Sequence, residues 1–195
     1  MNTREDKRVL RTKETLISTF RDMLATKRFE DITVNDLCAE SGIRRATFYK
    51  HFSDKYDFLR FFVGALRHEF DKVIWKKKKP DATAEYYVAY ARQIIEFVTR
   101  NSTMVKLVLE SEISPTILEI IMEQNYSDTC DRLRKSVDEG MILPTTIETM
   151  SAMLTGAVTR AIFMWFKNGM PTPKEKFIEE VSAGVAAMQK NAISS

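Results

Sequence analysis

Five side chains that can donate hydrogen bonds fall within eight consecutive residues, at Arg44, Arg45, Thr47, Lys50 and His51. Arginine can bind a guanine base through two parallel hydrogen bonds, and lysine and threonine commonly contact phosphate oxygens. Tyr49 adds a ring that can pack while its hydroxyl reaches a phosphate oxygen. The cluster therefore has the chemistry to read and hold DNA. An exposed arginine pair is also common on ordinary surfaces, so the elements that carry the pair decide between the two interpretations.

Residues 33–55 have the pattern of two short helices around a tight turn, followed by the start of a third helix. Thr33 is a good N-cap for the first of them. Gly42 predicts the end of that helix, because glycine accepts the left-handed backbone of a tight turn. Phe48 and Phe52, spaced i and i+4, are expected to pack inward and to leave the donor-bearing side chains on other faces. This is the pattern of a helix-turn-helix, whose second helix enters the DNA major groove.

The third helix of this segment is predicted to begin at Ser53, Asp54 and Lys55. Ser53 is a suitable N-cap, and Asp54 favours the positive end of the helix dipole. Free amides at such a helix start, together with the Lys55 ammonium, can hold a phosphate. The segment thus predicts base contacts from one helix and a backbone clamp from the next.

The string SGIRRATFYKHFSDKYDFL resembles the recognition core of TetR-family transcriptional regulators, and the close resemblance covers about residues 8–60. Two positions depart from the family pattern: Arg44 stands where Ser or Thr often caps the recognition helix, and Ala46 stands where Gly is common. The positions that carry the resemblance are Thr33, Gly42, Ile43, Thr47, Phe48, Tyr49, Phe52 and Lys55.

The resemblance implies an all-α fold of about nine helices. A three-helix DNA-binding domain is expected over residues 1–54, and a helical effector-binding and dimerisation domain over residues 55–195. We expect Arg44, Arg45 and Lys50 to read bases. The residues expected to fix the phosphate register are Thr33, Thr47, Tyr49, His51 and Lys55.

Charge is distributed unevenly along the 195 residues, of which 29% are charged and 44% hydrophobic. Residues 1–60 contain 13 Lys and Arg against 10 Asp and Glu, whereas residues 61–195 contain 17 of each, so the first segment carries the whole net charge of +3. This asymmetry is typical of a protein that approaches phosphates. The charged N-terminus and the absence of about 18 consecutive apolar residues predict a cytoplasmic protein with no membrane span.

Catalysis is the rival class of function, and the sequence gives it little support. The histidines, His51 and His68, have no metal-ligand spacing, and Cys38 and Cys130 suggest neither a disulfide framework nor a metal site. No glycine-rich phosphate loop or recognisable nucleophile motif is present. We therefore expect no enzymatic activity, no metal and no cofactor.

Helical periodicity continues along the rest of the chain. The first helix is expected over about residues 7–26, and a long fourth helix over about residues 54–75. The stretch KKKKPDAT, residues 76–83, is interpreted as a boundary, because proline rarely continues a helix. Five further helices are expected, at about residues 84–100, 103–110, 114–139, 147–167 and 173–190.

The last two of these helices carry wide apolar faces. In TetR-like proteins the corresponding helices pair across a two-fold axis as a four-helix bundle, which favours a homodimer. The alternative is that both helices simply complete the core of one chain. The residues expected at the dimer interface are Leu154, Val158, Ile162, Trp165, Phe166, Phe177, Val181 and Val185.

The middle helices are where the resemblance implies an effector pocket, with ligand binding releasing a repressor from its palindromic operator. Large aromatic and methionine side chains at helical spacing are also what an ordinary core contains. A second possibility is that a protein partner, rather than a small ligand, controls DNA binding. The candidate effector residues are Tyr86, Tyr90, Phe97, Met122, Tyr126 and Phe163.

Overall fold

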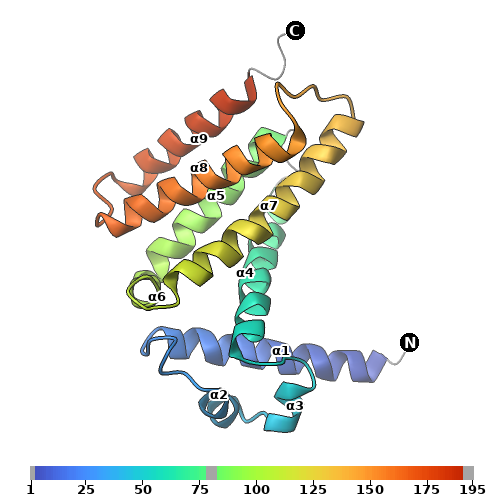
Figure 1. The fold of residues 1–195 in the computed structure, drawn as a ribbon, viewed down its shortest axis with the longest axis vertical. Coiled ribbons are helices and arrows are strands. Elements are labelled where there is room, and N and C mark those ends of the chain that lie inside the picture. The colour runs from blue at the N-terminus through green and yellow to red at the C-terminus, as the bar shows by residue number, and fades with distance from the viewer. Residues whose placement is uncertain (1–2, 78–82, 191–195) are drawn as a thin grey trace. The chain divides into compact units, whose positions relative to one another are not determined.

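A computed structural model describes residues 3–77 and 83–190, and every regular element in these ranges is a helix (Figure 1). This confirms the predicted all-α fold. The helices are α1 (Thr3–Leu24), α2 (Val34–Ser41), α3 (Arg45–Tyr49), α4 (Lys55–Lys77), α5 (Thr83–Arg100), α6 (Ser102–Leu109), α7 (Ser114–Asp138), α8 (Ile147–Lys167) and α9 (Lys174–Lys190).

The chain divides into two compact units, and the divisions fall inside α4 and α7 and at the end of α5. The head unit comprises Met1–Leu66 with Asn101–Leu118, and the body unit comprises Arg67–Arg100 with Glu119–Ser195. The assignment of DNA binding to residues 1–54, and of effector binding and dimerisation to residues 55–195, remains a prediction. No helix in the described ranges is long and apolar enough to cross a membrane.

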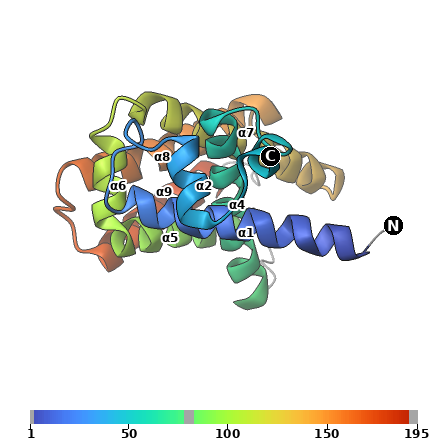
Figure 2. The same cartoon turned by 90° about the horizontal axis from the view of Figure 1, so that it is seen from below.

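Aromatic side chains form the centre of the head unit. The Phe20 ring of α1 packs edge-on against Phe58 and Phe62 of α4, with centroids 5.2 and 5.1 Å apart. Phe48 of α3 lies 5.8 Å from Phe58, so the same cluster reaches the short third helix. Helix α2 packs against both α1 and α3, and α6 packs against α1 (Figures 1 and 2). A helix of only five residues, such as α3, is not stable by itself, so its position depends on the burial of these rings.

The body unit is built around α5, which packs against α8 and α9. One core cluster joins Tyr86 and Tyr90 of α5 to Leu133 of α7 and Leu154 of α8. A second cluster includes Trp165 of α8 and lies toward the α8–α9 turn, where the Trp165 indole N–H donates to the Thr172 carbonyl at 2.9 Å.

Several helix boundaries differ from the sequence-based expectation. Helix α1 begins at Thr3, four residues earlier than predicted. The N-cap of α4 is Asp54 rather than Ser53, because the Asp54 carboxylate accepts the amides of Tyr56 and Asp57, each at 2.8 Å. Helix α4 ends at Lys77, and the rest of the predicted KKKKPDAT boundary, residues 78–82, lies outside the described residues.

Candidate nucleic-acid interface

The helix α2 and the turn that follows it are bounded by a capping residue and a glycine, both of which can be recognised in the sequence. Thr33 caps α2: its hydroxyl accepts the Asp36 amide at 3.1 Å, and the Asp36 carboxylate accepts the Thr33 amide at 3.0 Å. Gly42 has φ +68°, and the following Ile43 amide donates to the Cys38 carbonyl at 3.1 Å. This reciprocal cap and left-handed glycine fix where α3 begins.

Helix α3 presents its polar residues to solvent. Phe48 is fully buried, whereas Arg44, Arg45, Tyr49 and Lys50 are exposed. Arg44 occupies the N-cap position with extended backbone and makes no side-chain cap, so its guanidinium is not used to hold the helix start. Among the described residues, no ion pair joins Arg44, Arg45 or Lys50 to a carboxylate. These three cations are therefore available to an anionic partner.

Two predicted contact residues are half-buried at the edge of this surface, Thr47 and His51. Partial burial lowers the pKa of His51, and the neighbouring cations Lys13 and Lys50 lower it further. These effects favour the neutral form of His51. Lys13 belongs to α1 and adds a cation that the sequence did not assign to the interface, because it lies 37 positions before Lys50 in the chain. Tyr56, exposed at the start of α4, is a further phenol that the sequence analysis left without a role.

Lys55 is directed inward. Its ammonium donates to the carbonyls of Phe29, Glu30 and Ile32, at 3.1, 3.2 and 3.0 Å, and lies 4.5 Å from the centre of the Phe29 ring. An ammonium has three N–H donors, so these carbonyls can satisfy all of them. The phosphate contact expected of Lys55 stays a prediction, and a phosphate would have to compete with three internal hydrogen bonds.

The amides at the start of α4 are also occupied. The Asp54 carboxylate accepts two of them, and the Ser53 amide donates to the Asp57 carboxylate at 2.9 Å. Two carboxylates thus lie where the predicted backbone clamp would receive a phosphate. The exposed cations Arg44, Arg45 and Lys50 come from α3 and the residues at its two ends.

Two family models match the chain. Residues 16–60 match the model for bacterial regulatory proteins of the tetR family, and residues 85–185 match a transcriptional regulator C-terminal region of the same family. The chain belongs to the TetR family of transcriptional regulators. Members of this family are DNA-binding transcription factors rather than enzymes, which supports DNA-binding regulation as the role of this chain.

Known proteins similar to this TetR-family chain agree with the fold. An uncharacterised HTH-type transcriptional regulator of Bacillus subtilis, YxbF, is 46% identical over 56 residues, which are 28% of this chain and 15% of YxbF. A TetR-family regulator structure from Syntrophomonas wolfei superposes with a TM-score of 0.69 at 15% identity, covering 92% of this chain and 95% of that one. A TetR regulator structure from Streptococcus agalactiae gives 0.60 at 20% identity, covering 95% and 99%.

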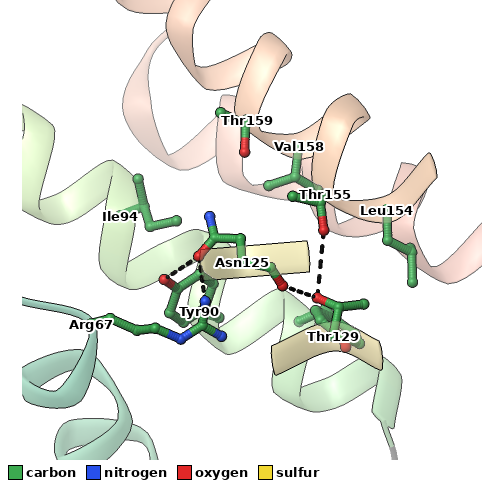
Figure 3. A pocket seen from close by; sticks show the side chains of 10 residues that line it. Arg67, Tyr90, Ile94, Asn125, Thr129, Leu154, Thr155, Val158 and Thr159 are labelled. Atoms are coloured by element: carbon green, nitrogen blue, oxygen red, sulfur yellow. Dashed lines mark hydrogen bonds between the residues drawn. The ribbon is translucent and has the colours of Figure 1, made fainter. Parts of the chain in front are cut away.

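The candidate effector residues have different surroundings in the described part of the body unit. A cavity of about 30 Å³ lies in the body unit of this TetR-family chain, and of the six candidates only Tyr90 lines it (Figure 3). Tyr86 is buried beside it in the core, Phe97 packs on Phe70, and Met122 is 45% exposed. Tyr126 and Phe163 are half-buried and do not line it. The other lining residues are Arg67, Tyr87, Ile94, Asn125, Thr129, Leu154, Thr155, Val158 and Thr159.

A charge-balanced network borders this cavity. Arg67 binds Asn125 and Asp128, and Arg132 binds Asp128 at 2.7 Å and Asp71 at 3.5 Å. Two arginines thus face two aspartates, which leaves no uncompensated charge. The Tyr90 hydroxyl donates to Asn125 at 3.0 Å (Figure 3), and burial raises the pKa of Tyr90 to about 12. The helical periodicity of the sequence does not predict which of these side chains contact one another, because they come from three different helices. Groups of three or more metal-ligating side chains do not occur in the described ranges.

The predicted dimer residues divide into two sets. Leu154, Ile162, Trp165, Phe177 and Val185 are buried within the chain itself, as the alternative of a completed monomer core requires. The other three, Val158, Val181 and Phe166, are only partly buried. A surface groove of about 270 Å³ runs between α8 and α9, and its lining residues are Ala157, Val158, Ala161, Phe177, Glu180, Val181, Gly184, Val185 and Met188.

Proposed function

We propose that this protein is a cytoplasmic repressor that binds a palindromic operator as a dimer and is released by an effector bound in its C-terminal domain. The observation that carries the proposal is the surface of α3, where Arg44, Arg45 and Lys50 are exposed and have no carboxylate partner in the described part of the chain, while Phe48 is buried. Arg44, Arg45 and Lys50 contact bases. Thr33, Thr47, Tyr49 and His51 contact phosphates, with Lys13 as an addition from α1.

Dimerisation places two copies of α3 against two half-sites. The α8–α9 groove supports this part of the proposal, because its lining is apolar apart from Glu180 and includes the small residues Ala157, Ala161 and Gly184, which allow close helix approach. A symmetric dimer uses the same patch on both chains, so the groove of one chain receives the partner's α8–α9 surface.

The effector proposed for the body unit is a small, uncharged molecule with hydrogen-bonding groups. The cavity offers neutral polar side chains, including Thr129, Thr155 and Thr159, and its arginine is already paired with Asp128. A cavity of about 30 Å³ accommodates one or two water molecules, so a larger ligand requires the surrounding helices to separate. Such separation is the means by which ligand binding shifts the population of DNA-binding states.

A second candidate function replaces the small effector with a protein partner. One observation favours it: the cavity described in the body unit is too small for more than one or two water molecules.

Selection of binding sites from random duplex DNA with the full-length protein tests the proposal. We expect enrichment of a palindrome whose half-sites lie about one helical turn apart or slightly more. Enrichment of a single half-site would contradict dimeric binding. Salt-sensitive binding without any enriched sequence would contradict the operator itself.

A further inference from the structure

Residues 101–118 occupy a particular place in the chain. They belong to the head unit, although the segments on both sides of them, α5 and the rest of α7, belong to the body unit. A change in the body that travels along α5 or α7 therefore arrives first at this segment. Whether a change that takes this route, rather than running along α4, reaches the helix-turn-helix depends on how residues 101–118 are attached to residues 1–66.

Glu30 makes such a fastening. It lies in the turn between α1 and α2, and its carboxylate accepts the amide of Ile113 at 3.1 Å. Ile113 is buried and precedes α7, and its carbonyl accepts the Ile117 amide at 2.9 Å, as an N-cap residue does. Burial opposes ionisation of Glu30, but hydrogen bonds from its own amide and those of Ile113 and Glu112 outweigh it, so the pKa is lowered. An ionised carboxylate thus binds the N-terminal end of α7.

The same turn is held from its other side by Lys55. The three carbonyls that its ammonium binds belong to Phe29, Glu30 and Ile32, and the next residue, Thr33, is the N-cap of α2. The turn is therefore fixed to the starts of both α2 and α4. Only Asp31 and Ile32 lie between Glu30 and the N-cap of α2. A displacement of Glu30 is therefore transmitted to the start of α2.

We propose that Glu30 is a positioning residue that couples the α6–α7 turn to the helix-turn-helix. The link is directional, because a hydrogen bond between a carboxylate and an amide fixes both distance and angle. Packing of α6 on α1 also holds these two segments together, but packing contacts are not directional. The regulatory meaning of the coupling rests on the proposed function, since it concerns how a signal reaches the DNA-reading helix.

Amide hydrogen exchange of the full-length protein tests the coupling without DNA. We compare wild type, Glu30→Ala, Glu30→Gln and the matched control Asp31→Ala, whose exposed side chain makes no hydrogen bond or ion pair within the described residues. In Glu30→Ala, exchange should rise about 10- to 100-fold in peptides covering residues 110–118 and also in those covering residues 29–38, the range expected for loss of a charged hydrogen bond. Glu30→Gln, which keeps an acceptor oxygen, should lie between Glu30→Ala and wild type.

Faster exchange at residues 110–118 alone, with residues 29–38 unchanged, would make the contact merely local and overturn the proposal. Equal effects of Asp31→Ala and Glu30→Ala would overturn it as well. If Glu30→Ala does not fold, the comparison of Glu30→Gln with wild type tests the coupling. Exchange in Glu30→Gln should then be faster than in wild type at residues 110–118 and also at residues 29–38, and unchanged exchange at residues 29–38 would overturn the proposal.

A second arm adds the duplex recovered by site selection. DNA should slow exchange in α3 of every variant, and should slow it at residues 110–118 in wild type at least tenfold more than in Glu30→Ala. Equal slowing in both would overturn the coupling. No slowing in α3 of wild type would count against the proposed DNA-binding function instead, and the DNA-free comparison would still decide the role of Glu30.

Discussion

At the scale of single residues, the two lysines that flank His51 differ in what their ammonium groups contact. Lys50 is exposed on α3, whereas Lys55 donates to three backbone carbonyls of the α1–α2 turn. Position in sequence alone does not reveal this difference. Their substitutions should therefore affect DNA binding through different causes.

Lys50→Met should reduce the slope of log K for DNA binding against log salt concentration, because an exposed cation that binds in the groove, even at a base, also displaces counterions from the neighbouring phosphates. Lys55→Met should leave that slope unchanged and lower the free energy of unfolding, since three carbonyls lose their partner. Titrations at several salt concentrations, with denaturant unfolding of each variant, measure both effects. A reduced slope for Lys55→Met would show instead that Lys55 contacts phosphate, as the sequence predicts.

His51 gives a prediction about pH. Its pKa is lowered in the free protein by partial burial and by Lys13 and Lys50, and a nearby phosphate would raise it. Binding then takes up a proton, so the affinity for DNA should increase as the pH falls from about 8 to about 6. His51→Gln should abolish this increase. An unchanged pH dependence in that variant would place His51 away from phosphate.

At the scale of elements, the sequence predicted the helix-turn-helix in detail because local chemistry decides it. The Thr33 cap, the left-handed Gly42 and the inward Phe48 are all visible as residue types at fixed spacing. The start of α4 was predicted one residue early, because Ser53 and Asp54 are both good caps and only the three-dimensional contacts choose between them. The inward direction of Lys55 depends on a turn more than 20 residues away, and no local pattern carries that information.

The α2 cap should be measurable as stability. Thr33→Ala removes the hydroxyl that accepts the Asp36 amide, and N-cap removal typically costs about 1 kcal/mol. The Thr33 hydroxyl also lowers the pKa of Asp36, so this part of the stability is present above the ordinary Asp pKa and is lost as the pH falls through the lowered value. Urea unfolding at neutral and acid pH should show a smaller acid loss in Thr33→Ala than in wild type. The control is Thr33→Ser, which keeps a capping hydroxyl, and an equal loss of stability in both variants would rule out the cap as the cause.

At the scale of the whole molecule, the sequence predicted two apolar helices but could not say which of their residues serve the chain's own core. Trp165 stacks on Phe177 with centroids 4.5 Å apart, so both are committed within the chain. The surface still available for a partner chain is the α8–α9 groove. Part of its lining consists of small residues, which a search for large apolar side chains overlooks. The cavity network was likewise hidden, because Arg67, Asn125 and Asp128 meet only after α4 and α7 pack together.

Ala157→Arg should disrupt the dimer while leaving the chain folded. Ala157 is exposed and lines the groove, so a long cation there obstructs a partner without displacing a core side chain. Sedimentation should show a monomer with unchanged helical content and with operator affinity reduced at least tenfold. Glu179→Arg, an exposed position of α9 outside the groove lining, is the matched control and should remain dimeric. A dimer in both variants would locate the interface elsewhere.

Base reading by α3 can be tested through the sequence specificity of the Arg45→Ala variant. Each base pair of the selected operator is changed in turn, and the affinity of wild type and variant is measured for every duplex at one salt concentration. We expect Arg45→Ala to weaken operator binding by about 1–3 kcal/mol and to become indifferent to the base pair at one position of each half-site, with the other positions unaffected. Specificity profiles that run parallel at every position would contradict base reading by Arg45.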